Sequence, residues 1–186
     1  MGVKANDLRR GQAVEYKNGV WVCQDNTKIA KGKGQSYQSI QLKNIESGQL
    51  IEERFRTTEE FEPVHVDRKT MEYLYSDNTG IVVMDPETYE QVNIHTDLIG
   101  DQAVYLKENI ALEIAFIGGN PITVELPNTV ELVVEETPPQ IKGATATNQY
   151  KDATCEGGAL VKVPPFVENG ELIKIDTRTG EYIGRA

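Results

Sequence analysis

Short apolar segments recur along the whole chain, separated by glycine, asparagine, aspartate or proline. Examples are "GVWVCQ", "SIQLKNI", "GIVVMD", "ITVELP" and "LIKIDT". Most run for about four to seven residues with partial alternation of apolar and polar positions, which is typical of β-strands. The sequence therefore predicts an all-β protein with many short strands. Barrels are the favoured closure because a closed sheet has no exposed edges.

Individual elements can be predicted within this pattern. Residues 130–134 and 172–175 are predicted strands, and Asn18-Gly19 and Asn169-Gly170 indicate hairpin turns because these residues tolerate positive φ. A short helix is expected near "HTDLIGDQAVYLKEN" (95–109), although Gly100 weakens it. The polar segment 142–158 predicts a single mobile loop.

Turn-rich stretches divide the chain into three parts. Boundaries at "EPVHVDRK" and "LPNTVEL" give predicted domains over residues 1–64, 65–128 and 129–186. Domains of about 60 residues bury modest cores, so neighbouring domains are expected to support one another.

Composition and charge narrow the function classes. The chain has 186 residues, 39% of them hydrophobic, and it lacks both a long apolar run and a secretory signal, so a cytoplasmic protein without a membrane partner is expected. The net charge of −10 argues against a generic basic nucleic-acid binder. Residues 1–64 nevertheless hold ten Lys and Arg against nine Asp and Glu, whereas residues 65–128 hold three against eleven. Such a protein would meet a polyanion through its N-terminal end.

Catalytic and metal chemistry find little support in the sequence. Cys23 and Cys155 are far apart without paired spacing, so buried or idle thiols are favoured over a disulfide. Adjacent carboxylates such as Glu52-Glu53 point to opposite faces of a strand, which prevents them from acting as an acid–base pair. Neither a nucleophile–histidine arrangement nor a metal-ligand cluster can be assembled. We expect no enzyme activity, no metal and no cofactor.

One predicted hairpin carries an unusual tip. The strand-like segments 20–28 and 36–45 flank Lys31, Gly32, Lys33 and Gly34. Glycines on both sides of Lys33 let the backbone approach another surface closely. The lysine then presents a point charge on a long stem, which suits phosphate or RNA. By itself such a tip is more often a solvated turn, and it lacks the spacing of a phosphate-binding loop.

Four separated segments stand out along the chain: "GKGQSYQSIQLKNIESGQLIEERF" (32–55), "MEYLYSD" with "MDPETYEQV" (71–92), "LPNTVELVVEETPP" (126–139) and "IDTRTGEYIGR" (175–185). In this order and spacing they resemble the elongation factor P family over the whole chain. The resemblance implies a KOW/SH3-like domain followed by two OB-folds in an L-shaped, tRNA-like arrangement. It also implies a monomer that binds the ribosome between the peptidyl-tRNA (P) and exit (E) sites and relieves stalling at consecutive prolines.

The resemblance also implies roles for individual residues. Lys33 would reach the end of the P-site tRNA, bare or carrying a post-translational extension added by a lysine-modifying enzyme. The ribosome would be the catalyst and Lys33 a positioning group. The remaining candidates for RNA contact, with rRNA, tRNA or the E-site codon, are Lys31, Gly32, Gly34, Arg9, Arg10, Lys28, Lys43, Gly143, Thr145, Arg178, Tyr182 and Arg185.

The chain departs from the family pattern at two places. Lys31 replaces the usual proline before Gly-Lys-Gly, which leaves open whether and how Lys33 is modified. Ala144 stands where family members often carry an aspartate in the loop near the E-site codon. An alanine at this place is a feature of elongation factor P-like paralogues. Two alternatives therefore remain: such a paralogue with a different stalling motif, or a general OB-fold RNA-binding module. Arg178 has a structural alternative as well, an ion pair with Asp176 or Glu181.

Overall fold

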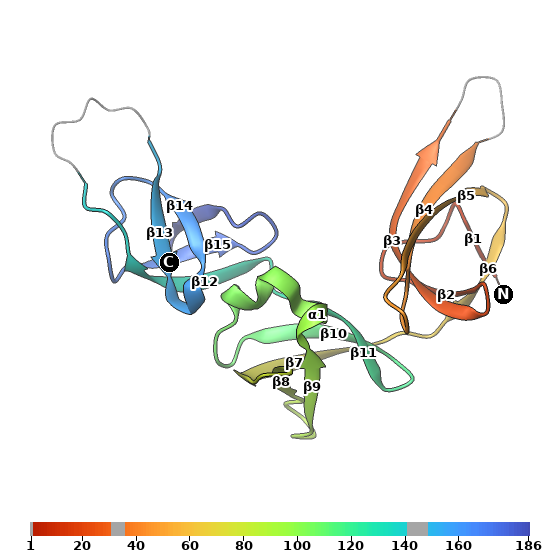
Figure 1. Cartoon of the computed structure of the whole chain (residues 1–186), viewed down its shortest axis with the longest axis horizontal. Helices are drawn as coiled ribbons and strands as arrows, with labels where there is room; N and C mark the ends of the chain where they lie inside the picture. Colours follow the sequence, from red (N-terminus) through yellow and green to blue (C-terminus); the bar gives the residue numbers. More distant parts are fainter. Residues whose placement is uncertain (1, 31–35, 141–148) are drawn as a thin grey trace. The chain divides into compact units, whose positions relative to one another are not determined.

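The computed structural model of the chain describes residues 2–30, 36–140 and 149–186 (Figure 1). Strands dominate these residues and are arranged in three antiparallel sheets that are strongly curved in the ribbon drawing. The helical segments of the described residues are short: α1 (Thr96–Ile99), η1 (Gly100–Tyr105) and η2 (Glu156–Gly158). The all-β prediction is confirmed.

The first sheet has six strands in the order β1-β6-β2-β3-β4-β5. Their bounds are β1 (Val3–Lys4), β2 (Ala13–Tyr16), β3 (Gly19–Ile29), β4 (Tyr37–Asn44), β5 (Leu50–Arg56) and β6 (Glu60–Val64). Its core contains a cluster of four rings that meet edge to face, with Phe55 and Phe61 4.9 Å apart between ring centroids and Tyr16 5.4 Å from Phe55. Such ring pairs stabilise a core beyond the area that they bury.

The second sheet has five strands in the order β11-β10-β7-β8-β9. Their bounds are β7 (Asp67–Ser76), β8 (Gly80–Met84), β9 (Gln91–His95), β10 (Ala111–Ile117) and β11 (Asn120–Glu125). Gly80 must be glycine, because a Cβ there would lie 1.9 Å from the carbonyl oxygen of Ile94.

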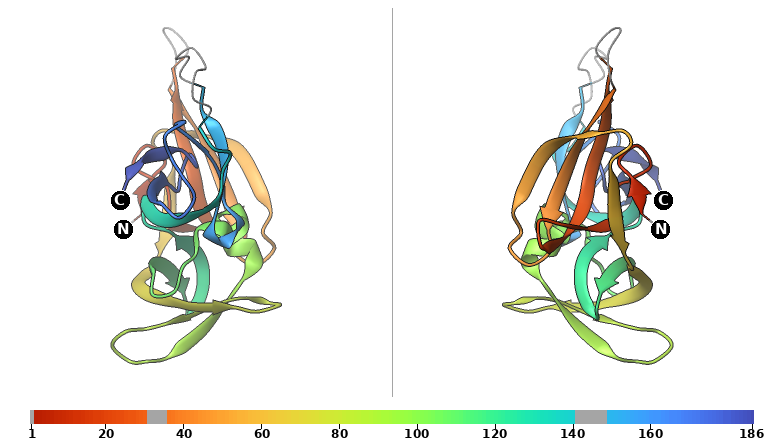
Figure 2. Two further views of the ribbon diagram at one scale, coloured as in Figure 1. Left: turned by 90° about the vertical axis from the view of Figure 1, so that its left-hand side faces the viewer. Right: turned by 90° about the vertical axis from the view of Figure 1, so that its right-hand side faces the viewer.

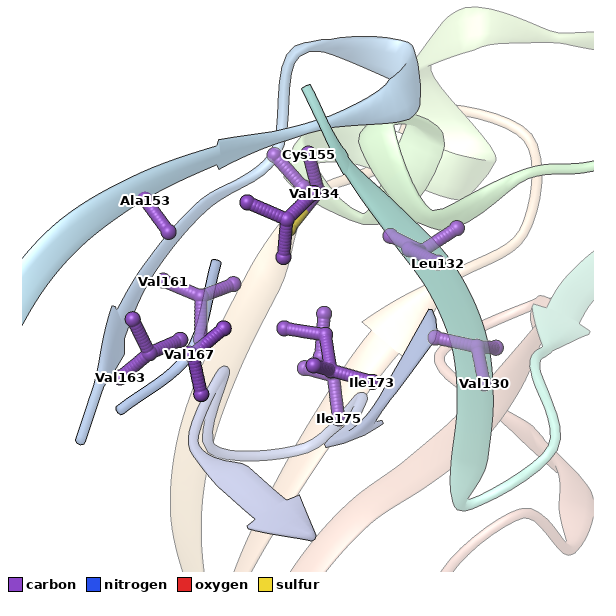
Figure 3. Close-up of a cluster of buried hydrophobic side chains, with 11 residues drawn as sticks. Val130, Leu132, Val134, Ala153, Cys155, Val161, Val163, Val167, Ile173 and Ile175 are labelled. Carbon is purple, nitrogen blue, oxygen red and sulfur yellow. The ribbon is translucent and has the colours of Figure 1, made fainter. Parts of the chain in front are cut away.

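The third sheet has five strands in the order β14-β13-β12-β15-β16. Their bounds are β12 (Thr129–Glu136), β13 (Lys151–Cys155), β14 (Leu160–Val163), β15 (Leu172–Asp176) and β16 (Tyr182–Arg185). Inward-facing side chains from β12 to β15 converge on one core, as Figure 3 shows for Leu132, Val161 and Ile173. The predicted strands at 130–134 and 172–175 are confirmed.

Each sheet falls within one of the three predicted segments. Contacts group the chain into two compact units: residues 1–67 with 115–122, and residues 68–114 with 123–186. The three-domain boundaries stay a prediction.

The first predicted hairpin turn forms one residue earlier than expected. Tyr16 pairs with Gly19, so the turn residues are Lys17 (φ 46°) and Asn18 (φ 58°). Gly19 instead begins β3 and allows close packing, because a Cβ there would meet the side-chain amide of Asn44 at 3.0 Å. Positive φ at both central residues is the signature of a two-residue hairpin turn.

Two further predictions are corrected in part. The helix expected over 95–109 has only one α-helical turn, because Gly100 (φ 56°, ψ −138°) ends it and a 3₁₀ segment follows. The loop expected over 142–158 is wrong for residues 151–158, which form β13 and η2, since Ala153 and Cys155 alternate into the core. Residues 141–148 lie outside the described part of the chain.

Both cysteines are free and buried, as expected. Burial, with a smaller contribution from nearby carboxylates, raises the pKa of each thiol to about 11.

Candidate functional site

The hairpin predicted to carry the lysine tip is formed by β3 and β4. The two strands run side by side (Figure 2), and we call this pair of strands the shaft of the hairpin. Their ladder of paired residues extends to Ile29 and Tyr37. Lys31, Gly32, Lys33 and Gly34 lie outside the described residues. Their role stays a prediction, but the described shaft fixes where the segment starts and ends.

Polar side chains tie the shaft to the start of the chain. The side-chain amide of Asn26 donates to the carbonyl oxygens of Ala5 (2.8 Å) and Leu8 (2.7 Å). Gln38, only 3% exposed, donates to the side-chain carbonyl of Asn6 at 2.9 Å. Sequence reasoning missed these supports, although polar residues at inward strand positions are a signal that could have found them. These donated hydrogen bonds hold the hairpin in one orientation against the start of the chain, although the side-chain oxygen of Asn26 is buried without a hydrogen-bond partner among the described residues.

A second polar contact joins β5 to the end of β2 and the turn that follows it. Glu53 accepts hydrogen bonds from the Tyr16 hydroxyl and the Lys17 ammonium group. These two hydrogen bonds lower the pKa of Glu53, and the bond from Lys17 has the larger effect. The pKa of Tyr16 is raised, mainly because its hydroxyl is partly buried. Glu52, its neighbour, lies on the opposite face and accepts from Ser39. The two carboxylates therefore do not form an acid–base pair, as the sequence predicted.

The four predicted basic contacts of the N-terminal domain that lie in described residues are exposed. Arg9 and Arg10 precede β2, Lys28 lies on β3, and Lys43 on β4. Lys28 pairs with Gln38, whose side chain faces the core side of the sheet. Lys43 lies two residues after Gln41 on β4, so its side chain faces the outer side. The structure therefore places Lys28 and Lys43 on opposite faces of the sheet.

Ion pairing differs sharply between the two ends of the chain. Among the described residues up to Val64, Lys17 is the only lysine or arginine within 4.0 Å of a carboxylate. In the described residues beyond Val64 the pattern is reversed: every lysine or arginine except Lys151 has a carboxylate partner, and Lys151 donates to the carbonyl oxygen of Pro138. Cations without a partner in the chain are the ones that can neutralise phosphates without breaking an existing contact.

The predicted contacts at the C-terminal end are engaged within the chain. Arg178 donates to both carboxylate oxygens of Asp176, from Nε at 3.1 Å and from Nη2 at 2.7 Å, which confirms the ion-pair alternative. The side-chain and backbone hydrogen bonds from Arg178 lower the pKa of Asp176 to about 2. The partner is Asp176 and not Glu181.

Arg185 and Tyr182 also have structural contacts. Arg185 donates to both carboxylate oxygens of Glu171 at 3.1 Å and to the carbonyl oxygen of Phe166, and its guanidinium lies 4.7 Å from the centre of the Phe166 ring. Tyr182 is half-buried against the third core. RNA contact by these residues stays a prediction. Gly143 and Thr145, together with Ala144, lie outside the described residues.

The turn that carries Arg178 packs against the segment that follows α1. Gln102 donates to the carbonyl oxygen of Thr177 at 3.4 Å, and the Thr177 hydroxyl donates to that of Pro127 at 2.6 Å. A Cβ at Gly180 would lie 3.0 Å from the Tyr105 hydroxyl. Part of the "DTRTGEY" motif therefore supports internal packing.

The described residues contain few side-chain arrangements that could bind a metal or a ligand. They contain no group of three or more His, Cys, Asp or Glu side chains placed to hold a metal ion. A small polar pocket of about 80 Å³ lies on the first sheet, lined by Asp25, Thr27, Ser39, Gln41 and Glu52. Within the same described ranges, no helix is long and apolar enough to cross a bilayer.

Three family models together match almost the whole chain. The "Elongation factor P (EF-P) KOW-like domain" matches residues 4–61, the "Elongation factor P (EF-P) OB domain" residues 66–124, and "Elongation factor P, C-terminal" residues 130–185. These matches confirm the predicted KOW-like and OB classes.

Curated relatives match over their full length. Proteins named elongation factor P are 44% identical in Desulfitobacterium hafniense (99% of this chain, 100% of the relative), 42% in Clostridium botulinum (98% and 99%) and 39% in Pelagibacter ubique (98% and 98%). Among solved structures, the eukaryotic translation initiation factor 5A from Methanococcus jannaschii aligns with a TM-score of 0.49 at 20% identity, covering 68% of this chain and 92% of that protein.

Proposed function

Because this chain belongs to the elongation factor P family, it is a translation elongation factor, and we propose that it acts on ribosomes that stall at consecutive prolines. In this proposal it binds between the P and E sites, and Lys33 positions the end of the P-site tRNA. The tRNA-like arrangement of the three domains, a monomeric state and a cytoplasmic location belong to the same proposal.

The distribution of ion pairs is the observation that supports this orientation. The exposed cations Arg9, Arg10, Lys28 and Lys43 have no carboxylate partner in the described chain, whereas nearly all cations beyond Val64 do. We therefore expect the N-terminal domain to face RNA, because its cations can bind phosphate without breaking an ion pair within the protein. The acidic stretch 65–128 limits indiscriminate adhesion to RNA.

The proposed role of Lys33 is positional. Proline is a rigid, poor nucleophile, and a polyproline chain restricts the poses of the P-site ester. Holding the tRNA end in an attack-ready pose recovers rate, because a misplacement of about 1 Å can cost ~100-fold. The ribosome supplies the chemistry, so Lys33 needs no general base beside it.

Reconstituted synthesis of a triproline-containing peptide tests this function. Wild-type protein, produced with its own modifying enzymes, should restore synthesis past the prolines. Lys33→Ala should lose the rescue while retaining ribosome binding, and Lys31→Ala serves as the matched charge control. Failure of the wild-type protein to rescue would remove the proposal. Rescue of a different stalling motif would favour the paralogue, and tight binding to free RNA without ribosome preference would favour the general OB-fold module.

The mass of the peptide that contains Lys33 decides whether the residue is modified. With Lys31 beside Gly32, a modifying enzyme meets an altered local sequence. An unmodified mass together with full rescue would show that Lys33 works bare. An added mass would identify the class of extension and, by its chemistry, the enzyme that supplies it.

A further inference from the structure

The hairpin formed by β3 and β4 continues past the apolar core of the first sheet. Strand β2 pairs with β3 as far as Val22, and the later residues of β3 extend beyond β2 (Figure 1). The apolar core ends near the pair of Asn26 and Ile40, because Ile40 is fully buried whereas Lys28, the next inward position on β3, is exposed. The angle at which the hairpin continues is therefore not set by apolar packing alone.

Three amide side chains join this part of the hairpin to the segment that follows β1. The side-chain nitrogen of Asn26 donates to two backbone carbonyl oxygens, those of Ala5 and Leu8. The side-chain nitrogen of Gln38 donates to the side-chain oxygen of Asn6. We call Asn6, Asn26 and Gln38 the amide cluster. It connects both strands of the hairpin to residues 5–8.

The segment that the amide cluster contacts is itself held in the fold. Ala5 and Leu8 are buried in the first core. The backbone N–H of Ala5 donates to the carbonyl oxygen of Glu59 at 2.7 Å, and that of Leu8 donates to the carbonyl oxygen of Lys4 at 3.1 Å, which closes a turn. The amide cluster therefore ties the hairpin to a packed part of the domain.

Stability alone would favour apolar residues at these inward positions. The side-chain oxygen of Asn26 is buried without a partner among the described residues, and such an atom costs stability that an apolar side chain would not lose. An apolar contact depends on buried area and has no preferred direction, whereas a hydrogen bond weakens steeply when its donor tilts away. The amide cluster is therefore better suited to fixing an angle than to adding stability.

We propose that Asn6, Asn26 and Gln38 are positioning residues, which set the angle of the β3–β4 hairpin for peptide-bond formation on the ribosome. This inference rests on the proposed function, because Lys33 is five residues from Gln38 in the sequence. The described ladder continues for three residue pairs beyond Asn26 and Ile40, about 10 Å. A tilt at the amide cluster grows along this length, and a misplacement of about 1 Å can cost ~100-fold in rate.

An Asn26→Leu/Gln38→Leu double variant tests the proposal, because leucine fills the space but donates no hydrogen bond. In reconstituted synthesis of a triproline-containing peptide, the maximal rate should fall about tenfold, while the factor concentration for half-maximal rescue should change by less than about twofold. A cluster that only stabilises the fold would leave both quantities unchanged in a folded variant. Gln91→Leu, at an exposed position of β9, is the matched control and should behave like wild type.

Variants of Asn6 decide the question if the double variant does not fold, because Asn6 is exposed. Asn6→Ala should lower the maximal rate about threefold, since one hydrogen bond is lost, whereas Asn6→Asp keeps an oxygen acceptor for Gln38 and should retain most of the rate. The effects of Asn6→Ala and Gln38→Leu should not add, because both remove the same hydrogen bond. Additive effects, or equal losses in the two variants of Asn6, would overturn the proposal.

The angle of the hairpin can also be measured without the ribosome. Spin labels on Ala30→Cys, just after β3, and on Glu62→Cys, on β6, occupy exposed positions, while the native cysteines are buried. Pulsed electron paramagnetic resonance then gives the distribution of distances between the labels. The distribution should be broader in the Asn26→Leu/Gln38→Leu background than in the wild-type background. An unchanged distribution would overturn the proposal.

These outcomes separate this inference from the proposed function. If wild type rescues triproline synthesis and the folded double variant reaches the same maximal rate, the positioning role fails and the function stands. A loss confined to the half-maximal concentration would make the amide cluster a support for binding and would also overturn the inference. If wild type does not rescue, the function fails and this inference fails with it.

All proteins are compared at equal modification of Lys33, judged by the mass of its peptide. A lower rate that disappears at equal modification would show that the amide cluster serves a modifying enzyme, which overturns the proposal. A lower rate that remains at equal modification supports it.

Discussion

The backbone carbonyl oxygen of Val104 lies so close to Gly157 that a Cβ built on that glycine would be only 2.7 Å away. Gly157 also has φ of 76°, in the left-handed region. The same contact region holds Glu156, which accepts a hydrogen bond from the backbone N–H of Val133 at 3.0 Å and pairs with Lys107 at 3.4 Å. Segment 104–107 is therefore fixed against η2 by backbone packing and by charge.

Gly157→Ala should destabilise the protein by about 2–3 kcal/mol, since it adds left-handed strain and a backbone clash. Gly158→Ala is the matched control, because Gly158 has φ of 80° but a Cβ there would meet nothing within 4 Å. We expect about 1 kcal/mol for the control, from strain alone. Denaturant unfolding followed by circular dichroism measures both. Equal losses would mean that the contact with Val104 carries no cost.

The carboxyl group of Asp176 should titrate near pH 2, well below the usual value of about 3.9. Because the folded pKa is depressed, the contribution of this group to stability is present above the unfolded pKa and is lost as pH falls from about 4 towards 2. Arg178→Gln should move the pKa of Asp176 part of the way back up and weaken this pH dependence, because the backbone N–H of residue 178 still donates to the carboxylate. Carboxyl carbon shifts in an NMR titration report it directly. An unchanged low pKa in the variant would contradict the assignment to Arg178.

Arg185→Gln should lower stability by about 1 kcal/mol, because it removes the paired contacts to Glu171 and the ring contact with Phe166 on a partly exposed surface. The expected shift in melting temperature is about 2–4 °C. Lys162→Gln, which breaks an exposed pair with Asp152, should change it by less than about 1 °C. If Arg185→Gln melts like wild type but binds ribosomes more weakly, the main role of Arg185 is RNA contact.

Both cysteines should resist thiol reagents in the native protein. Their pKa values of about 11 leave little thiolate at pH 8, and both side chains are buried. An aromatic disulfide reagent should label neither thiol within minutes under native conditions and both in denaturant. Rapid labelling of one thiol in the native state would locate a part of the fold that opens readily.

Strand positions could be predicted because each short apolar segment has a period of two and ends at a residue that disfavours strands. The turn at Lys17 and Asn18 escaped the prediction, because the choice between two adjacent turn positions depends on packing between Gly19 and Asn44, which are far apart in sequence. Residues 151–158 were hidden for a similar reason. Their polar composition suggests a loop, but pairing with β12 and β14 makes a strand of 151–155 and packing orders η2.

The sequence by itself determined the all-β class, the family and the concentration of positive charge near the N-terminus, because periodicity, motif order and charge are all properties of the linear chain. Tertiary structure alone decided which charges are available. Arg178 and Arg185 are paired within the chain, whereas Arg54 and Arg56 are aligned without a carboxylate partner among the described residues. Pairing depends on distances between side chains across strands and turns, and those distances exist only once the sheets have formed.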